Sequence, residues 1–357
     1  MKTNPAVFAV HDTYHIMVQP AEESLMWVKV GEKEYYDDCN GVLCSRARVH
    51  RMIVPAKELD EAGGYTICQR KVIERSTYYP KTGEVEEAAF SFRPVKSDQP
   101  RCFHIADTHN LVEEPIAAAK AYGEIDFLIL NGDLPDSSDE WSFFDVIYQI
   151  ASEITEGEIP IVFARGNHDM RGHFAEHMME YIPLENGKTY FTFRLGNIWG
   201  LVLDCGEDKP DDSVEYGNTI CCHAFRERQT AFIEEVIRQE EYLAPGIERR
   251  IIVTHNPFTM PKEEYFYIEK EIYGRWAKLL DEYIKPDVMI TGHEHRVRVQ
   301  RVGNPEDEIL QPCPVIVGAK PVHQEKYYIG TGITFGKEHI DVVFMDNRAE
   351  TVGREVL

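Results

Sequence analysis

The sequence lacks any hydrophobic run long enough to cross a membrane. A transmembrane helix needs about 20 consecutive apolar residues, whereas the apolar stretches of this chain are short and interrupted by polar side chains. Residues 1–8 also lack the long apolar segment and the cleavage site of a signal peptide. We therefore expect a cytoplasmic protein without a membrane partner, or a secreted protein if an export signal has been removed.

Positive charge is scarce in this chain. It has 38 Lys and Arg residues and 61 Asp and Glu residues, which gives a formal net charge of −23. Proteins bind long nucleic acids by neutralising phosphates with basic residues, and the sequence contains no Lys/Arg cluster of that kind. We expect no long nucleic-acid partner. A small-molecule phosphate ester is compatible with this charge, because bound divalent cations would reverse its sign locally.

Closely spaced cysteine pairs and sequence repeats are also missing. The eight cysteines contain no Cys-x-x-Cys spacing, which argues against a structural zinc site. Without an export signal, we expect these thiols to be reduced. The 357 residues contain 43% hydrophobic residues and no low-complexity segment, so they suffice for one large domain or two smaller ones.

The first 97 residues predict a small β-sandwich. They contain short strand-like runs separated by turn-rich stretches. These runs are residues 14–18, 24–30, 49–54, 65–72 and 88–93. The segment that ends at Tyr65, residues 59–65, resembles the tyrosine corner of fibronectin type III domains, in which the hydroxyl bonds to backbone a few residues upstream. The alternative reading is that Tyr65 is an ordinary aromatic residue of a strand.

The character of the chain changes after a proline-bounded polar linker at residues 94–100. Apolar strands then alternate with helical patterns, which is typical of βαβ units in an α/β protein with a mostly parallel sheet. We expect helices at residues 113–122, 139–152, 171–180, 223–240 and 271–284, and a further strand at 340–345. The predicted domains are therefore residues 1–97 and 98–357.

Five short stretches after buried apolar runs carry two Asp, one Asn and four His in positions that favour metal binding. They are Ala-Asp-Thr-His-Asn at 106–110, Gly-Asp-Leu-Pro-Asp at 132–136, Gly-Asn-His-Asp at 166–169, Thr-His-Asn at 254–256 and Gly-His-Glu-His at 292–295. In open α/β sheets, side chains that follow strands gather at one edge of the sheet. Five such stretches in this order predict one common site.

This pattern resembles the calcineurin-like metallophosphoesterase superfamily, from about residue 100 to the C-terminus. The resemblance implies an α/β fold of two mixed sheets stacked between helices, here preceded by the small all-β sandwich. An N-terminal fibronectin-like sandwich before such a domain is similar to the architecture of purple acid phosphatases. Those enzymes have a Tyr three residues after the metal-bridging Asp, where this chain has Asp136, and they lack the equivalent of His109.

The resemblance implies a ligand set for two divalent metal ions. Asp107, His109 and His295 would bind the first ion, and Asp133 would bridge both. The remaining ligands would bind the second ion, and they are Asn167, His255 and His293. This set of carboxylate, amide and imidazole groups suits Mn, Fe or Zn.

The geometry of the last motif needs an explanation, because His293 and His295 are two residues apart. They can face one centre only if the backbone departs from a regular strand, and Gly292 would permit that.

The same resemblance gives His168 a catalytic role without metal binding. It would protonate the leaving oxygen while a metal-bridging hydroxide attacks phosphorus. Asp136 would pair with His168, fix its tautomer and raise its pKa. Two loops, residues 204–212 and 258–267, either shape the substrate pocket or are solvated connections.

The function that follows is a dinuclear-metal-dependent hydrolase of small or moderately sized phosphomonoesters or phosphodiesters. One alternative is a nucleotide or cyclic-nucleotide phosphodiesterase. The other is a non-catalytic binding module that has kept the fold, although such a module would be expected to have lost some ligands.

Overall fold

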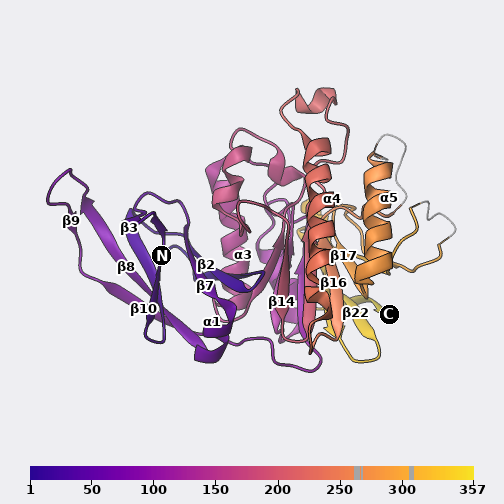
Figure 1. The fold of residues 1–357 in the computed structure, drawn as a ribbon, viewed down its shortest axis with the longest axis horizontal. Coiled ribbons are helices and arrows are strands. Elements are labelled where there is room, and N and C mark those ends of the chain that lie inside the picture. Colours follow the sequence, from indigo (N-terminus) through magenta and orange to yellow (C-terminus); the bar gives the residue numbers. More distant parts are fainter. Residues whose placement is uncertain (261–265, 267, 305–308) are drawn as a thin grey trace.

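The computed structural model describes residues 1–260, 266, 268–304 and 309–357. Two large β-sheets face each other, and helices cover their outer faces (Figure 1). The expected α/β architecture of two stacked sheets between helices is confirmed. Among the helices of these residues, none is both long enough and apolar enough to cross a bilayer.

The larger sheet has ten strands and contains both ends of the chain. Its order is β23 (Thr351–Val356), β22 (Ile340–Asp346), β21 (Tyr327–Phe335), β11 (Arg101–Ile105), β12 (Phe127–Asn131), β13 (Ile161–Ala164), β1 (Ala6–Val10), β2 (Thr13–Val18) and β7 (His50–Pro55), with β20 (Lys320–Val322) paired to β21. Strands β11, β12, β13 and β1 run parallel to one another. Helices α2 (Glu113–Tyr122) and α3 (Asp145–Thr155) pack on its outer face.

The smaller of the two facing sheets has six strands. Its order is β14 (Phe191–Leu195), β15 (Ile198–Leu203), β16 (Arg249–Thr254), β17 (Val288–Thr291), β19 (Val315–Val317) and β18 (Arg298–Gln300). Helix α4 (Cys222–Gln239) and helix α5 (Lys270–Leu279), which continues as a π-helical turn (Leu280–Ile284), cover its outer face.

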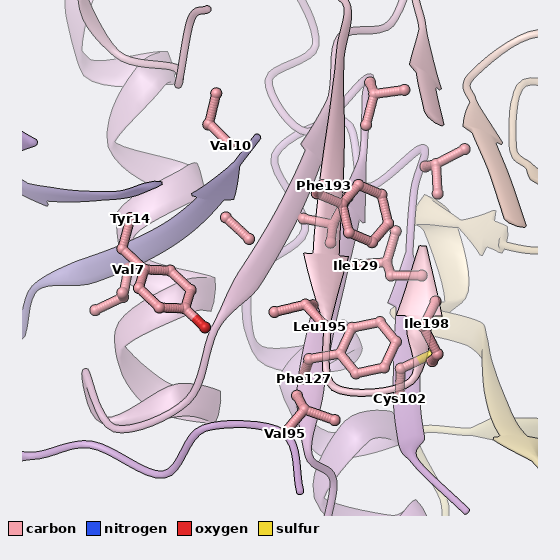
Figure 2. Close-up of a cluster of buried hydrophobic side chains, with 14 of the residues drawn as sticks. Val7, Val10, Tyr14, Val95, Cys102, Phe127, Ile129, Phe193, Leu195 and Ile198 are labelled. Carbon is pink, nitrogen blue, oxygen red and sulfur yellow. The ribbon is translucent and has the colours of Figure 1, made fainter. Parts of the chain in front are cut away.

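An apolar core fills the space between the two sheets. Phe127 and Ile129 from the ten-stranded sheet meet Phe193, Leu195 and Ile198 from the six-stranded sheet (Figure 2). All five side chains are buried, and each such side chain contributes about 1.5–3 kcal/mol through removal from water. This layer fixes the two sheets face to face.

The N-terminal strands form a further pair of layers. A five-stranded sheet contains β3 (Ser24–Val30), β4 (Lys33–Tyr36), β8 (Gly64–Glu74), β9 (Lys81–Thr82) and β10 (Glu86–Ser91). Its buried residues Val28 and Ile67 share one core with Ile16 and Val54 of β2 and β7. A short hairpin, β5 (Asp38–Cys39) with β6 (Val42–Leu43), and helix α1 (Ala56–Ala62) complete this region.

The N-terminal region differs from the expected separate sandwich in one respect. Strands β1, β2 and β7 belong to the ten-stranded sheet, because β1 pairs in parallel with β13 at Phe8 and Ile161. All five residues of β1 are buried. Residues 1–97 and 98–357 therefore share one continuous sheet, which the prediction of two separate domains did not include.

The predicted tyrosine corner is wrong. The hydroxyl of Tyr65 donates a hydrogen bond to the carbonyl of Gly157 at 2.7 Å, and this carbonyl lies 92 residues downstream instead of a few residues upstream. The ring stacks on Phe90, with 5.4 Å between the centroids. Tyr65 thus connects the N-terminal layers to the loop after α3.

Residues 171–180 do not form the expected α-helix. The structure has one short 3₁₀ turn just before this range, η2 (His168–Met170), and another within it, η3 (Ala175–Glu180). Gly172 between them has a φ of 127°, which a right-handed helix excludes. Further 3₁₀ turns are η1 (Trp141–Phe144), η4 (Val214–Tyr216), η5 (Glu241–Leu243) and η8 (His323–Glu325).

A chain that begins at residue 98 should not fold stably. This truncation removes β1, which leaves the edge of β13 unpaired and uncovers the core beneath it. Exposed sheet edges promote aggregation. We expect loss of soluble protein, or loss of the cooperative thermal transition measured by circular dichroism.

The control is a partial deletion that replaces residues 75–80, the loop of the β8–β9 hairpin, by the two-residue turn Asn-Gly. Tyr78 and Tyr79 in this loop are 78% and 91% exposed. This deletion should change Tm by only a few degrees. Native-like cooperative unfolding of the chain from residue 98 would contradict the prediction.

Candidate metal centre

The structure brings all seven predicted ligands to one edge of the two facing sheets. Asp107, His109, Asp133 and Asn167 follow β11, β12 and β13, whereas His255, His293 and His295 follow β16 and β17. These are carboxyl ends of parallel strands, which is where open α/β sheets place their sites. The centre is thus shared between the sheets.

One group of ligands contains Asp107, His109 and His295. Its ligand atoms all lie within 4.8 Å of one another. The Nε2 atoms of His109 and His295 are 3.0 Å apart, and His295 Nε2 lies 3.6 Å from Asp107 Oδ1. Two imidazole nitrogens and a carboxylate oxygen therefore converge on one point.

The second group contains Asp133, His255 and His293, again with ligand atoms within 4.8 Å of one another. His255 Nε2 lies 3.1 Å from Asp133 Oδ2 and 3.6 Å from Asp107 Oδ1, so it also adjoins the first group. The side-chain amide of Asn167 lies 3.0 Å from His293 Nδ1. The two groups are neighbours in one cluster.

The backbone of this cluster is unusual, because five of the seven ligands lie in the left-handed region. Their φ values are 52° for Asp107, 44° for His109, 52° for Asp133, 70° for His293 and 50° for His295. Such conformations cost of order 1–3 kcal/mol each for residues with a side chain, and they concentrate at functional sites. His293 and His295 reach one centre through their own left-handed turns.

Gly292 serves a different purpose from the one that its sequence position suggested. It does not have a positive φ. A Cβ atom at this position would lie 2.6 Å from Ala106 Cβ and 2.7 Å from Asp107 Oδ2, which is closer than non-bonded atoms approach. The missing side chain therefore lets the carboxylate of Asp107 approach the backbone that carries His293.

The charges of the cluster depend on one another. Asp107, Asp133 and His255 are all buried. Burial raises the pKa of Asp107 to about 8, partly offset by His255. Burial alone would lower the pKa of His255, but the two carboxylates raise it to about 10. Burial likewise opposes ionisation of Asp133, but His255 holds its pKa below the usual range.

The donor set fits divalent metal ions. Metal ligands must be deprotonated, so a cation bound here would take the place of the shared protons and neutralise the buried carboxylates. Four imidazoles, two carboxylates and one amide provide only nitrogen and oxygen donors, which suit Mn, Fe or Zn.

A buried amide beneath the ligands links the two sheets. Asn131 at the end of β12 directs its Nδ2 to the carbonyls of Thr254 and Ile290, each at 3.2 Å, and to His104 Nε2 at 3.0 Å. Its main-chain carbonyl accepts a hydrogen bond from His255 Nδ1 at 2.6 Å. That bond leaves His255 Nε2 free as a metal ligand, an arrangement that is usual for metal-binding histidines.

The comparisons with known proteins agree with this geometry. A family model for the calcineurin-like phosphoesterases matches residues 100–297, which is more than half of the chain and includes all seven ligands. The chain belongs to the calcineurin-like phosphoesterase family. It is therefore a metal-dependent phosphoester hydrolase, and the family implies divalent metal ions.

Two solved structures share the fold of this calcineurin-like phosphoesterase at low sequence identity. The purple acid phosphatase PPD1 from yellow lupin (Lupinus luteus) seeds is 12% identical with a TM-score of 0.61, and the match covers 100% of this chain and 74% of that one. A structure of PhoD is 11% identical with a TM-score of 0.57, and covers 99% and 88%. A comparison with curated protein sequences finds no match.

The predicted pairing of the Asp136 carboxylate with His168 differs from the structure of this phosphoesterase. His168 Nδ1 instead donates to the main-chain carbonyl of Asp136 at 2.9 Å. The Asp136 carboxylate is 61% exposed and lies 3.1 Å from His109 Nδ1. Asp136 thus contacts both histidines, one through its backbone and one through its side chain.

A pocket of about 600 Å³ opens beside the phosphoesterase centre. It is lined by Asp133, Asn167, His168, Arg171, Asp208, Lys209, Phe266, His293, Glu294, His295 and Arg296. The loop at 204–212 therefore shapes the pocket. Phe266 of the second predicted loop also lines it, whereas residues 261–265 and 267 lie outside the described residues.

Sequence reasoning missed two residues beside the centre. Arg171 lies next to His168, and the ring of His323 lies 6.1 Å from that of His109. Its position three residues after His168 could have indicated that Arg171 lies close to this histidine. His323 comes from a distant turn with no motif around it, so the sequence held no comparable sign.

Gly292→Ala should weaken metal binding, because the added methyl group would displace Asp107 or the backbone before His293. We expect affinity for Mn or Zn to fall by about 10–100-fold, as for other changes that disturb ligand orientation. Equilibrium dialysis followed by elemental analysis would measure it.

Gly274→Ala in α5 is the matched control, since no heavy atom lies within 4 Å of its added Cβ. It should leave metal affinity unchanged and stabilise the helix by about 1 kcal/mol or less. Wild-type affinity in Gly292→Ala would show that the close approach of Asp107 is dispensable.

Proposed function

We propose that this protein hydrolyses small or moderately sized phosphate esters with two divalent ions, one per ligand group. The observation that carries the proposal is the division of the ligands into two adjoining triplets, Asp107 with His109 and His295, and Asp133 with His255 and His293. His255 contacts the carboxylates of both Asp107 and Asp133, which supports the closeness of the two triplets. When bound, such ions supply a hydroxide at neutral pH and neutralise phosphoryl oxygens.

The protein residues have separate roles in this proposal. Asp133 belongs to the second triplet and adjoins the first through His255, whose Nε2 lies 3.1 Å from Asp133 Oδ2 and 3.6 Å from Asp107 Oδ1. Its Oδ1 accepts a hydrogen bond from the His168 backbone N–H at 2.8 Å. That position suits a carboxylate shared by two cations. Asn167 extends the second group through its contact with His293, and its neutral amide adds a ligand without adding charge.

His168 is the proposed general acid. It lines the pocket and lies outside the triplets that contain Asp107 and Asp133, although it forms a further cluster of possible ligands with His109 and Asp136. The Asp136 carbonyl orients its Nδ1, so Nε2 is the atom that would deliver a proton to the leaving oxygen. Asp136 is a positioning residue in this scheme, through its carbonyl on His168 and its carboxylate on His109.

The finer features of the function are proposals of the same kind. The metals are Mn, Fe or Zn, since the donors are nitrogen and oxygen. The substrate is a phosphomonoester or a phosphodiester. The fibronectin-like character of residues 1–97 and the cytoplasmic location stay predictions from the sequence.

The proposal requires two metal ions per chain. Elemental analysis of metal-reconstituted protein should give two equivalents, and anomalous scattering from crystals should show both ions. Asp133→Asn should lower the occupancy of both, whereas His295→Ala should lower that of one ion. A single ion held only by Asp107, His109 and His295 would contradict the proposal.

His168→Ala should lower kcat by about 10²–10⁴-fold, the usual contribution of general acid catalysis. The loss should be smaller for p-nitrophenyl phosphate than for alkyl phosphates, because p-nitrophenolate leaves without a proton. Metal content should stay at the wild-type value. Steady-state rates with both substrates measure the effect.

His177→Ala, the same substitution at an exposed histidine paired with Glu180, is the control and should retain wild-type kcat. Equal losses for both leaving groups in His168→Ala, or loss of metal, would refute the assigned role of His168.

A further inference from the structure

Arg171 lines the pocket, and a buried carboxylate fixes the orientation of its guanidinium. Its Nε donates to Glu207 Oε1 and its Nη2 donates to Glu207 Oε2, each at 2.7 Å. The Glu207 side chain is fully buried. Such two-point pairing of a guanidinium with a carboxylate sets the plane of the guanidinium as well as its position.

Tyr216 and Asp208 strengthen this support. The hydroxyl of Tyr216 lies 2.9 Å from Glu207 Oε2 and 3.1 Å from Asp208 Oδ1. Asp208 Oδ1 in turn lies 3.4 Å from Arg171 Nη2. The loop after β15 therefore contacts one side of the guanidinium and restricts its rotamer. Little side-chain entropy is left to lose when the arginine binds a ligand.

The opposite side of Arg171 faces the catalytic histidine. Its Nη1 lies 3.2 Å from His168 Nε2. Because His168 Nδ1 donates to a carbonyl, the Nε2 of the neutral ring is the acceptor of this contact. The N–H groups of Arg171 thus point to the place where a phosphoryl group would sit.

We propose that Arg171 binds the phosphoryl oxygens of the substrate, and that Glu207 and Tyr216 position it for this task. The inference rests on the proposed function, because it places the substrate phosphate beside His168. On binding, Nη1 exchanges the imidazole nitrogen for a phosphoryl oxygen. This exchange also frees the lone pair of His168 Nε2 to take up a proton from water.

The other two cations of the pocket are less suited to this role. Lys209 lies 2.9 Å from Glu215, and it carries a single charge without the planar fork that matches phosphate oxygens. Arg296 pairs through Nε with Glu294 at 2.6 Å, and its side chain is 54% exposed. Arg171 is the arginine of this pocket that has a buried support and a contact with His168.

The test compares substrate and product binding in metal-loaded variants. Arg171→Gln alone would leave the buried Glu207 carboxylate without its partner. The double variant Arg171→Gln/Glu207→Gln removes both charges together and avoids this. Arg171→Lys keeps the charge but loses the fork. Arg296→Gln tests the other arginine of the pocket. Arg238→Gln is the matched control, because this arginine of α4 pairs with Glu235 away from the pocket and its side chain is 63% exposed. The measurements are KM and kcat for p-nitrophenyl phosphate, Ki for inorganic phosphate, and metal content.

We expect the double variant to raise KM and Ki by about 10–100-fold, the usual effect of losing a charged hydrogen bond, with wild-type metal content. Arg171→Lys should give a smaller rise in both constants. Glu207→Gln should also raise them while Arg171 is still present, because the fork is then loosened. Arg296→Gln should raise both constants less than the double variant does. Arg238→Gln should leave both within about twofold, since exposed charges contribute little.

Unchanged KM and Ki in a folded, metal-loaded double variant would overturn the inference and leave the proposed function standing. The same would follow if Arg296→Gln raised Ki as much as the double variant. In contrast, a metal-loaded wild-type protein that neither hydrolyses p-nitrophenyl phosphate nor binds inorganic phosphate would remove the proposed function itself.

Discussion

Ligands from two separate sheets can meet only if the sheets are held at a fixed distance and register. Apolar packing between them, in a core that contains Phe127 and Phe193, is strong but non-directional, so alone it tolerates small sliding movements. Asn131 adds direction, because its amide reaches the carbonyls of Thr254 and Ile290 across the interface. Its carbonyl also orients His255. One residue therefore joins the sheets and prepares a metal ligand, directly beneath the point where the ligands converge.

The catalytic half of the fold could be predicted because each ligand follows a short apolar run that is buried on both faces. The N-terminal half was harder to predict. The five residues of β1 are too few to show a period, and nothing local reveals that their partner is β13. Tyr65 had the sequence context of a fibronectin corner but bonds to Gly157. Pairing across 90 or more residues is a tertiary choice, which local patterns cannot encode.

Which residues gather at this edge of the sheets could be predicted, but the atoms that make their contacts could not. The sequence placed Asp136 beside His168, yet the contact uses a main-chain oxygen, and backbone atoms are the same in every residue. It assigned flexibility to Gly292, whereas His293 and His295 themselves adopt the left-handed conformation. The support of Arg171 by Glu207 joins two loops. Residue types limit the chemistry of a site, but the folded chain decides which atoms face one another.

The pairing of β1 with β13 also has a consequence for the nascent chain. Ile161 leaves the ribosome about 150 residues after its partner Phe8, a delay of about 8–30 s at a synthesis rate of 5–20 residues per second. During this time, of the two strands that pair with β1, only β2 has been made. The central sheet is therefore completed late in translation, and one edge of its first strand stays unpaired until β13 has been made.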